Sequence, residues 1–205
     1  MSTTRCCFQM SSQYNEDDII KQFFGEKRDG RFLDIGAYDG KTFSNTFALA
    51  ERGWSGVCVE ASPQCFYGMQ KTYDQNPNIR LVSAAVATEN GCVKFYDNGG
   101  AVASMNEKHK AKWEVSVPFK EIYVMAITPY KLLEMFPGPY DFVSIDIEGD
   151  TLFVLSSFPS LKELEVTLVC VEVDGGKTPR ADAIMDRFGF VLEGITTENR
   201  LYKRK

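Results

Sequence analysis

The chain has 205 residues, of which 44% are apolar and 25% are charged. This composition is typical of a globular protein with a packed core and excludes a disordered chain. The net charge of −5 argues against nucleic acid as the main partner, because phosphate binding normally requires a basic face. No apolar run reaches the roughly 18 residues of a transmembrane helix, so no membrane association is expected.

The length fits one α/β domain, which we place at residues 12–205, after a short N-terminal extension over residues 1–11 that could be disordered. The six cysteines show neither a C-x-x-C pair nor the spacing of a disulfide framework. The first ten residues lack the basic and apolar regions of a signal peptide. We therefore expect reduced thiols and a cytoplasmic protein.

Apolar residues at helical spacing predict a first helix from about Asn15, with Asn15 and Asp18 in a capping arrangement. A short apolar run over residues 31–37 predicts a buried strand, and a helical pattern over 42–52 follows it. Residues 98–122 show the least regular pattern. Further strands are predicted over 56–60, 79–87, 92–96, 140–147, 168–173, 190–192 and 200–203, and further helices over 63–73, 128–136, 151–157 and 180–188.

Strands that alternate with helices predict right-handed βαβ crossovers. The expected fold is therefore α/β, with a doubly wound, mostly parallel seven-stranded sheet flanked by helices and a C-terminal antiparallel hairpin. In such sheets ligands bind beyond the carboxyl ends of the strands, where the strand order reverses. The loops after the strands are therefore the places to look for a site.

The loop after the first strand carries the strongest signal, the sequence DIGAYDG over residues 34–40, followed by Glu60 at the end of the second strand. Gly36 and Gly40 allow a tight turn, and the Glu60 carboxylate can accept both hydroxyls of a ribose. A dinucleotide would require the spacing G-x-G-x-x-G, which is absent, and Asp34 and Asp39 would repel a pyrophosphate. Carboxylates here favour a cationic ligand, such as the ammonium and sulfonium groups of S-adenosylmethionine.

Three stretches of the chain resemble the FkbM-type family of S-adenosylmethionine-dependent methyltransferases. They are RFLDIGAYDGKTFSNT at 31–46, GWSGVCVEASP at 53–63 and VSIDIEG at 143–149, and Ser12-Gln13 with the helix after it is also similar. The resemblance covers most of residues 12–175. It implies the class I, Rossmann-like methyltransferase fold, S-adenosyl-L-methionine as cofactor and an oxygen as the acceptor atom.

The resemblance also implies a set of cofactor-binding residues. Asp34, Gly36, Ala37 and Gly40 would line the methionine end, Glu60 would hold the ribose, and Asp146 would lie beside the reacting centre. Ala61 and the turn at Ser83 to Ala85 would flank the adenosine, although Ser83 stands where family members often have a polar amide. The full expected set is Asp34, Gly36, Ala37, Asp39, Gly40, Glu60, Ala61, Ser83, Ala84, Ala85 and Asp146.

Acidic residues follow two later strands. Asp146 and Glu148 are two apart and therefore share one face of an extended strand end, where a proton, a cation or a ligand would relieve their repulsion. We expect Asp146 near the site, and Glu148 is a candidate base, although it could instead accept amides from the next helix. Glu172 and Asp174 repeat the spacing and could line the acceptor pocket, with a turn at Asp174 as the alternative.

His109 is the only histidine and lies in a Lys-rich segment of irregular pattern. It could serve as a general base if the segment covered the site, whereas an exposed loop histidine is the simpler interpretation. The candidate catalytic residues are thus Asp146, Glu148 and His109. Asp146, Glu148 and Glu172 could offer oxygen ligands to Mg²⁺, but no metal-binding spacing supports this, so no metal site is expected.

These observations predict an S-adenosylmethionine-dependent methyltransferase that methylates a hydroxyl oxygen, or as the second choice a carboxyl oxygen, of a small molecule or sugar. The alternative is a non-catalytic domain that keeps the fold and binds an adenosine ligand or an interaction partner. A nicotinamide-dependent oxidoreductase is disfavoured by the glycine spacing and by the two aspartates of the first loop. The expected partner is a small-molecule or glycan acceptor.

Overall fold

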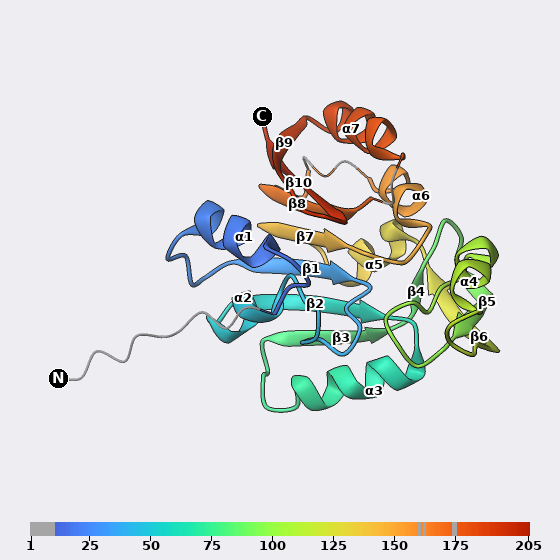
Figure 1. Cartoon of the computed structure of the whole chain (residues 1–205). Coiled ribbons are helices and arrows are strands. Elements are labelled where there is room, and N and C mark those ends of the chain that lie inside the picture. Colours follow the sequence, from blue (N-terminus) through green and yellow to red (C-terminus); the bar gives the residue numbers. More distant parts are fainter. Residues whose placement is uncertain (1–10, 160, 162, 174–175) are drawn as a thin grey trace.

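The computed structural model describes residues 11–159, 161, 163–173 and 176–205. Its centre is a seven-stranded sheet in the order β3-β2-β1-β7-β8-β10-β9 (Figure 1). Five of its strands pair in parallel, and β10 runs antiparallel to both β8 and β9. The strands are β1 Arg31–Ile35, β2 Ser55–Glu60, β3 Ile79–Ser83, β7 Phe142–Ile145, β8 Leu168–Glu172, β9 Phe190–Ile195 and β10 Asn199–Arg204.

The central strands are buried on both faces. In β1, Leu33 and Ile35 pack into one apolar cluster, whereas Phe32 packs into a second cluster on the opposite face. This two-sided burial explains why the strand reads as a continuous apolar run. Helices cover the sheet (Figure 1), and they are α1 Glu16–Phe24, α2 Phe47–Glu51, α3 Pro63–Thr72, α5 Pro129–Met135, α6 Thr151–Ser156 and α7 Thr178–Arg187. The doubly wound sheet and its C-terminal hairpin are therefore confirmed.

A second sheet of three strands, β4-β6-β5, lies beside the carboxyl ends of the central strands (Figure 1). Its strands are β4 Ala85–Val86, β5 Gly91–Asp97 and β6 Lys120–Ile127, and helix α4 Glu107–Trp113 connects β5 to β6. One expectation was wrong here, because the strand expected over 79–87 is divided between the two sheets. In addition, α4 lies in the stretch 98–122 and β6 begins there, although no helix or strand was predicted for either. The sequence of α4, EKHKAKW, carries no apolar periodicity that would reveal a helix.

Some element boundaries and one helix cap also differ from expectation. The helix expected over 42–52 is confined to α2, because Phe43 has a φ of +58° that no α-helix accommodates. Strand β7 ends at Ile145, two residues early. Asn15 occupies the N-cap of α1 but its side chain makes no capping bond; the Asp17 carboxylate instead accepts the backbone amides of Ser11 and Ser12.

Cys58, Cys65 and Cys170 are buried free thiols and Cys92 is an exposed one. Cys6, Cys7 and residues 1–10 of the expected extension lie outside the described residues. In the part of the chain that the structure describes, no helix has the length and apolar character required to cross a bilayer.

Candidate active site

An open cavity of about 910 Å³, counted up to bulk solvent, lies at the carboxyl ends of β1, β2 and β7. This is where the strand order reverses, since β1 is flanked by β2 on one side and β7 on the other. Ligands of α/β sheets bind at this position, beyond the carboxyl ends of the strands. The position of the cavity therefore identifies it as the candidate active site.

Glu60, the last residue of β2, is fixed at the wall of this cavity. Its Oε2 accepts the backbone amide of Tyr38 at 2.9 Å, and its Oε1 accepts that of Ser62 at 2.7 Å. Burial, opposed in part by these amides, raises the pKa of Glu60 from 4.5 to about 7. The carboxylate is therefore oriented by the backbone and held in a largely desolvated position.

Asp34 lies one strand away and is also buried at the cavity wall. Thr46, which is fully buried, donates its hydroxyl to Asp34 Oδ2 at 2.6 Å. Burial raises the pKa of Asp34 from 3.8 to about 6, and the Thr46 hydrogen bond lowers it in part. Two acidic side chains of raised pKa thus line one cavity, an arrangement that is common in functional sites.

The close approach of neighbouring atoms explains the glycines at positions 36 and 40 more directly than contact with a ligand does. Gly36 has a φ of +85°, and a Cβ atom on it would lie 1.6 Å from the backbone oxygen of Asp146. Only glycine allows the loop after β1 to pass this close to the end of β7. A Cβ on Gly40 would lie 2.6 Å from the ring of Tyr73, whose hydroxyl donates to the Gly40 carbonyl oxygen at 2.8 Å.

Most of the expected cofactor-binding residues lie around the cavity. Those that line it are Asp34, Gly36, Ala37, Glu60, Ala61, Ala84, Ala85 and Asp146. Asp39, Gly40 and Ser83 do not line it. The Asp39 carboxylate turns back to accept the amides of Lys41 and Thr42, and Ser83 is exposed.

Part of the lining comes from segments that sequence reasoning did not assign to the cofactor. Phe95, Ala103 and Met105 contribute from the second sheet and its loop, and Gln13 contributes from the segment before α1. The similarity of Ser12-Gln13 to the family was the one signal at Gln13. Nothing in the alternating pattern of β5 distinguishes Phe95, which faces the cavity only because the second sheet stands against the first.

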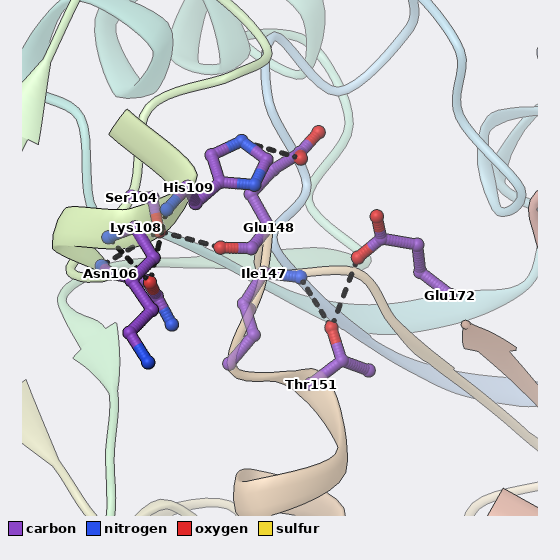
Figure 2. Close-up of polar contacts among 8 residues, drawn as sticks. All are labelled: Ser104, Asn106, Lys108, His109, Ile147, Glu148, Thr151 and Glu172. Atoms are coloured by element: carbon purple, nitrogen blue, oxygen red, sulfur yellow. Dashed lines mark hydrogen bonds and ion pairs between the residues drawn. The ribbon is translucent and has the colours of Figure 1, made fainter. Parts of the chain in front are cut away.

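A cluster of carboxylates lies at the edge of the cavity, and Figure 2 shows two of them, Glu148 and Glu172. Asp146, Glu148 and Glu172 each place one oxygen so that all three lie within 4.8 Å of one another. Asp146 and Glu148 line the cavity, whereas Glu172 lines a small separate cavity and accepts the Thr151 hydroxyl at 3.2 Å. Burial, followed by the charges of Glu172 and Glu148, raises the pKa of Asp146. Asp174, the other acceptor-side candidate, lies outside the described residues.

His109 belongs to this cluster and not to an exposed loop, so the simpler interpretation of it was wrong. It is 7% exposed and lies in α4, where the Asn106 side chain caps the helix by accepting the amides of Lys108 and His109. Its Nε2 is 3.0 Å from Glu148 Oε2 (Figure 2). The two atoms are at ion-pair distance without the alignment of a hydrogen bond. His109 does not itself line the cavity.

The segment between β5 and α4 also holds the backbone of Glu148. Ser104 donates its hydroxyl to the Glu148 carbonyl oxygen at 2.6 Å, and Glu148 has a φ of +53°, which is rare for a residue with a side chain. Asp150 accepts Asn106 Nδ2 at 2.9 Å and makes no capping bond to α6. The loop after β7 is therefore fixed by the segment that leads into α4.

Comparison with known structures shows the fold. The chain is similar to a TehB-like S-adenosylmethionine-dependent methyltransferase from Corynebacterium glutamicum, with 10% identity, a TM-score of 0.51 and coverage of 95% of this chain and 89% of that one. It is also similar to a precorrin-6y C5,15-methyltransferase from Geobacter metallireducens, with 14% identity, a TM-score of 0.52 and coverage of 92% and 88%. A fibrillarin from Aeropyrum pernix, with natively bound S-adenosylmethionine, gives 8% identity, a TM-score of 0.51 and coverage of 86% and 66%.

No curated protein matches the chain in sequence. The sequence profile of the FkbM methyltransferase domain matches residues 34–193, which include every residue that lines the cavity except Gln13. This span exceeds half of the 205 residues. The match confirms the expected resemblance and, with it, S-adenosylmethionine as the cofactor. The chain belongs to the FkbM family of methyltransferases.

Proposed function

We propose that this protein transfers the methyl group of S-adenosylmethionine to a hydroxyl oxygen of a small molecule or sugar bound at the carboxylate edge of the cavity. The observation that carries the proposal is the oriented, buried carboxylate of Glu60 at the end of β2. Its two oxygens are fixed by backbone amides, which leaves lone pairs for the two hydroxyls of a ribose. Charge-assisted hydrogen bonds of this kind are about twice as strong as neutral ones.

Asp34 would face the methionine part of the cofactor. Its carboxylate is buried at the wall formed by the loop after β1, and a cationic ammonium or sulfonium group would compensate its desolvation. Ala61, Ala84 and Ala85, with Phe95 from the second sheet, supply small and aromatic surfaces that suit the adenine ring. The residues around the cavity therefore fit the ribose, the methionine part and the adenine ring of the cofactor.

The acceptor would lie on the Asp146 side. The cofactor supplies an electrophilic methyl group, and the protein must align an acceptor oxygen with it and remove the proton of the hydroxyl. Glu148 is the best placed group for that proton, because its carboxylate lines the cavity and is held by His109 at 3.0 Å. His109 acts as a positioning residue, since it touches Glu148 but not the cavity.

The charge at this edge supports a neutral acceptor. Asp146, Glu148 and Glu172 would repel the phosphates of a nucleic acid, whereas hydroxyl groups can donate to them. A small molecule or a sugar presents several such hydroxyls. The carboxylates therefore favour a polyhydroxylated acceptor over an anionic one.

Methyl transfer is tested directly by incubating the protein with S-adenosylmethionine carrying an isotopically labelled methyl group and a panel of acceptors, including sugars, small alcohols and phenols. Mass spectrometry of the products would locate the label, and Glu148→Gln would be run beside the wild type. Label on an acceptor oxygen, lost in the variant, is expected. Label on nitrogen or carbon, or transfer that Glu148→Gln leaves unchanged, would contradict the assignment of the acceptor site.

A further inference from the structure

The carboxylates of Asp146, Glu148 and Glu172 come from two neighbouring strand ends that are far apart in sequence. Their oxygens lie within 4.8 Å of one another. A Mg²⁺ or Ca²⁺ ion bound by oxygens at about 2.0–2.6 Å spaces its ligand atoms about 3–5 Å apart, so the span of the cluster matches that of a coordination shell. Three like charges at this distance repel one another unless a positive charge lies between them.

Two buried atoms without hydrogen-bond partners point to the same place. Asp146 Oδ1 is inaccessible to solvent and unpartnered, although the residue as a whole is partly exposed. His109 Nε2, on a side chain that is 5% exposed, lies 3.0 Å from Glu148 Oε2 and also lacks an aligned hydrogen bond (Figure 2). Buried polar atoms are normally satisfied, so an unpartnered carboxylate oxygen beside a misaligned His109–Glu148 ion pair indicates a missing ligand.

We propose that Asp146, Glu148 and Glu172 bind a divalent, oxygen-seeking cation, of the class of Mg²⁺ or Mn²⁺, at the acceptor edge of the cavity. Carboxylates are the ligands that such ions prefer. Lys177 lines a small separate cavity with Glu172, and His109 lies 3.0 Å from Glu148. A proton shared between Asp146 and Glu172 is the competing way to relieve the repulsion.

The cation has a defined task in the reaction, and this part of the inference rests on the proposed function. Because Asp146 and Glu148 line the cavity, an acceptor hydroxyl could complete the coordination shell. Coordination lowers the pKa of the hydroxyl. Its proton then passes to the Glu148–His109 pair, the oxygen lone pair forms the bond to the methyl carbon, and the electrons of the carbon–sulfur bond remain on sulfur in S-adenosylhomocysteine.

The test is titration of the full-length protein with MnCl₂, followed by electron paramagnetic resonance and calorimetry, without cofactor or acceptor. We expect one saturable Mn²⁺ per chain, displaced by Mg²⁺. Glu172→Gln should weaken it by about tenfold or more, on the scale that loss of metal-site interactions produces. Glu134→Gln, which makes the same charge change on an exposed side chain of α5, should leave it unchanged.

Glu172 does not line the cofactor cavity, so Glu172→Gln should still bind S-adenosylhomocysteine within about twofold of the wild type. This separates the two proposals, because the cation site can fail while cofactor binding persists. Circular dichroism would verify folding, and Glu148→Gln would replace a variant that does not fold. Absence of saturable Mn²⁺ binding would overturn the cation site, and it is the result that a proton shared between Asp146 and Glu172 would give. Equal Mn²⁺ affinity in the cluster variant and the wild type would also overturn it.

Discussion

The backbone amide of Tyr38 donates to Glu60 Oε2 at 2.9 Å, so a hydrogen bond joins the carboxylate at the end of β2 to the loop that follows β1. This one contact joins the two sequence motifs on which cofactor binding depends. Because the carboxylate is oriented before any ligand arrives, little conformational entropy is lost when it binds. The cavity is therefore organised by the backbone of the sheet and its first loop.

Replacing Gly36 with alanine should prevent normal folding. The new Cβ would lie 1.6 Å from the Asp146 backbone oxygen, so two central strand ends would have to separate. Gly189 provides a matched control, because its φ of +84° nearly equals the +85° of Gly36 but its Cβ would meet nothing within 4 Å. Gly189→Ala should cost about 1 kcal/mol from backbone strain alone. Urea denaturation would compare the two; similar losses would show that β1 and β7 do not approach as closely as described.

The stability of the protein without cofactor should depend on pH through Glu60. Burial raises its pKa from 4.5 to about 7, so the folded state holds this proton more tightly than the unfolded state between those values. The stability that the protonated group provides is complete below pH 4.5 and is lost as pH rises to about 7.

Glu60→Gln removes this titration. The stability of Glu60→Gln relative to wild type should increase between pH 5 and pH 8, by at most about 3 kcal/mol at the conversion of about 1.4 kcal/mol per pKa unit. Urea denaturation across this range measures how the stability difference between variant and wild type changes with pH. Glu134 is an exposed carboxylate, so the stability difference for Glu134→Gln should not change with pH. If the stability of Glu60→Gln relative to wild type did not change with pH, Glu60 would not be desolvated.

Thr46→Val should destabilise the protein increasingly as Asp34 ionises. The lost hydrogen bond, 2.6 Å long, favours the charged form of Asp34, whose pKa is about 6. A hydrogen bond to a charged group is worth about 1.5–3 kcal/mol and one to a neutral group about 0.5–1.5 kcal/mol. The loss should therefore be larger at pH 8 than at pH 5.

Thr72→Val is the control for this change, because Thr72 donates to a neutral backbone oxygen, that of Asp39, at 2.8 Å. Its loss should not vary with pH. Denaturation of both variants at the two pH values gives the comparison. If the two variants lost stability with the same pH dependence, the Thr46 hydrogen bond would not favour the charged form of Asp34.

With an acceptor in hand, Glu148→Gln should lower kcat by about 10²–10⁴-fold, the usual contribution of a general base. The affinity for S-adenosylhomocysteine should change little. His109→Asn should lower kcat less, because His109 orients Glu148 at 3.0 Å without lining the cavity. Steady-state kinetics with separate kcat and KM would check this order; a larger loss in His109→Asn than in Glu148→Gln would reverse the two roles.

The central sheet could be predicted because its signals are local. Strands such as β1 are buried on both faces and therefore appear as continuous apolar runs, and Pro63 and Pro129 mark helix starts. The cofactor edge followed from Asp34 and Glu60, since parallel strand ends meet at one side of the sheet. These inferences need only the order of the elements.

The acceptor edge could not be predicted in the same way. Helix α4 is held by its Asn106 cap and by contacts with the loop after β7, which are absent from any local pattern. His109 is buried only through these contacts. The proximity of Glu172 to Asp146 likewise depends on β8 lying beside β7, a pairing that spacing along the chain does not reveal.

The most direct test of the account is calorimetric titration of the protein with S-adenosylhomocysteine, with NAD as a ligand control and Glu60→Gln and Glu134→Gln as variants. We predict binding of S-adenosylhomocysteine but not NAD by the wild type, and an affinity reduced about 10- to 100-fold in Glu60→Gln, as the loss of hydrogen bonds to a charged group implies. Glu134→Gln should match the wild type. Folded protein that does not bind S-adenosylhomocysteine, or a Glu60→Gln variant that binds it equally well, would contradict the account.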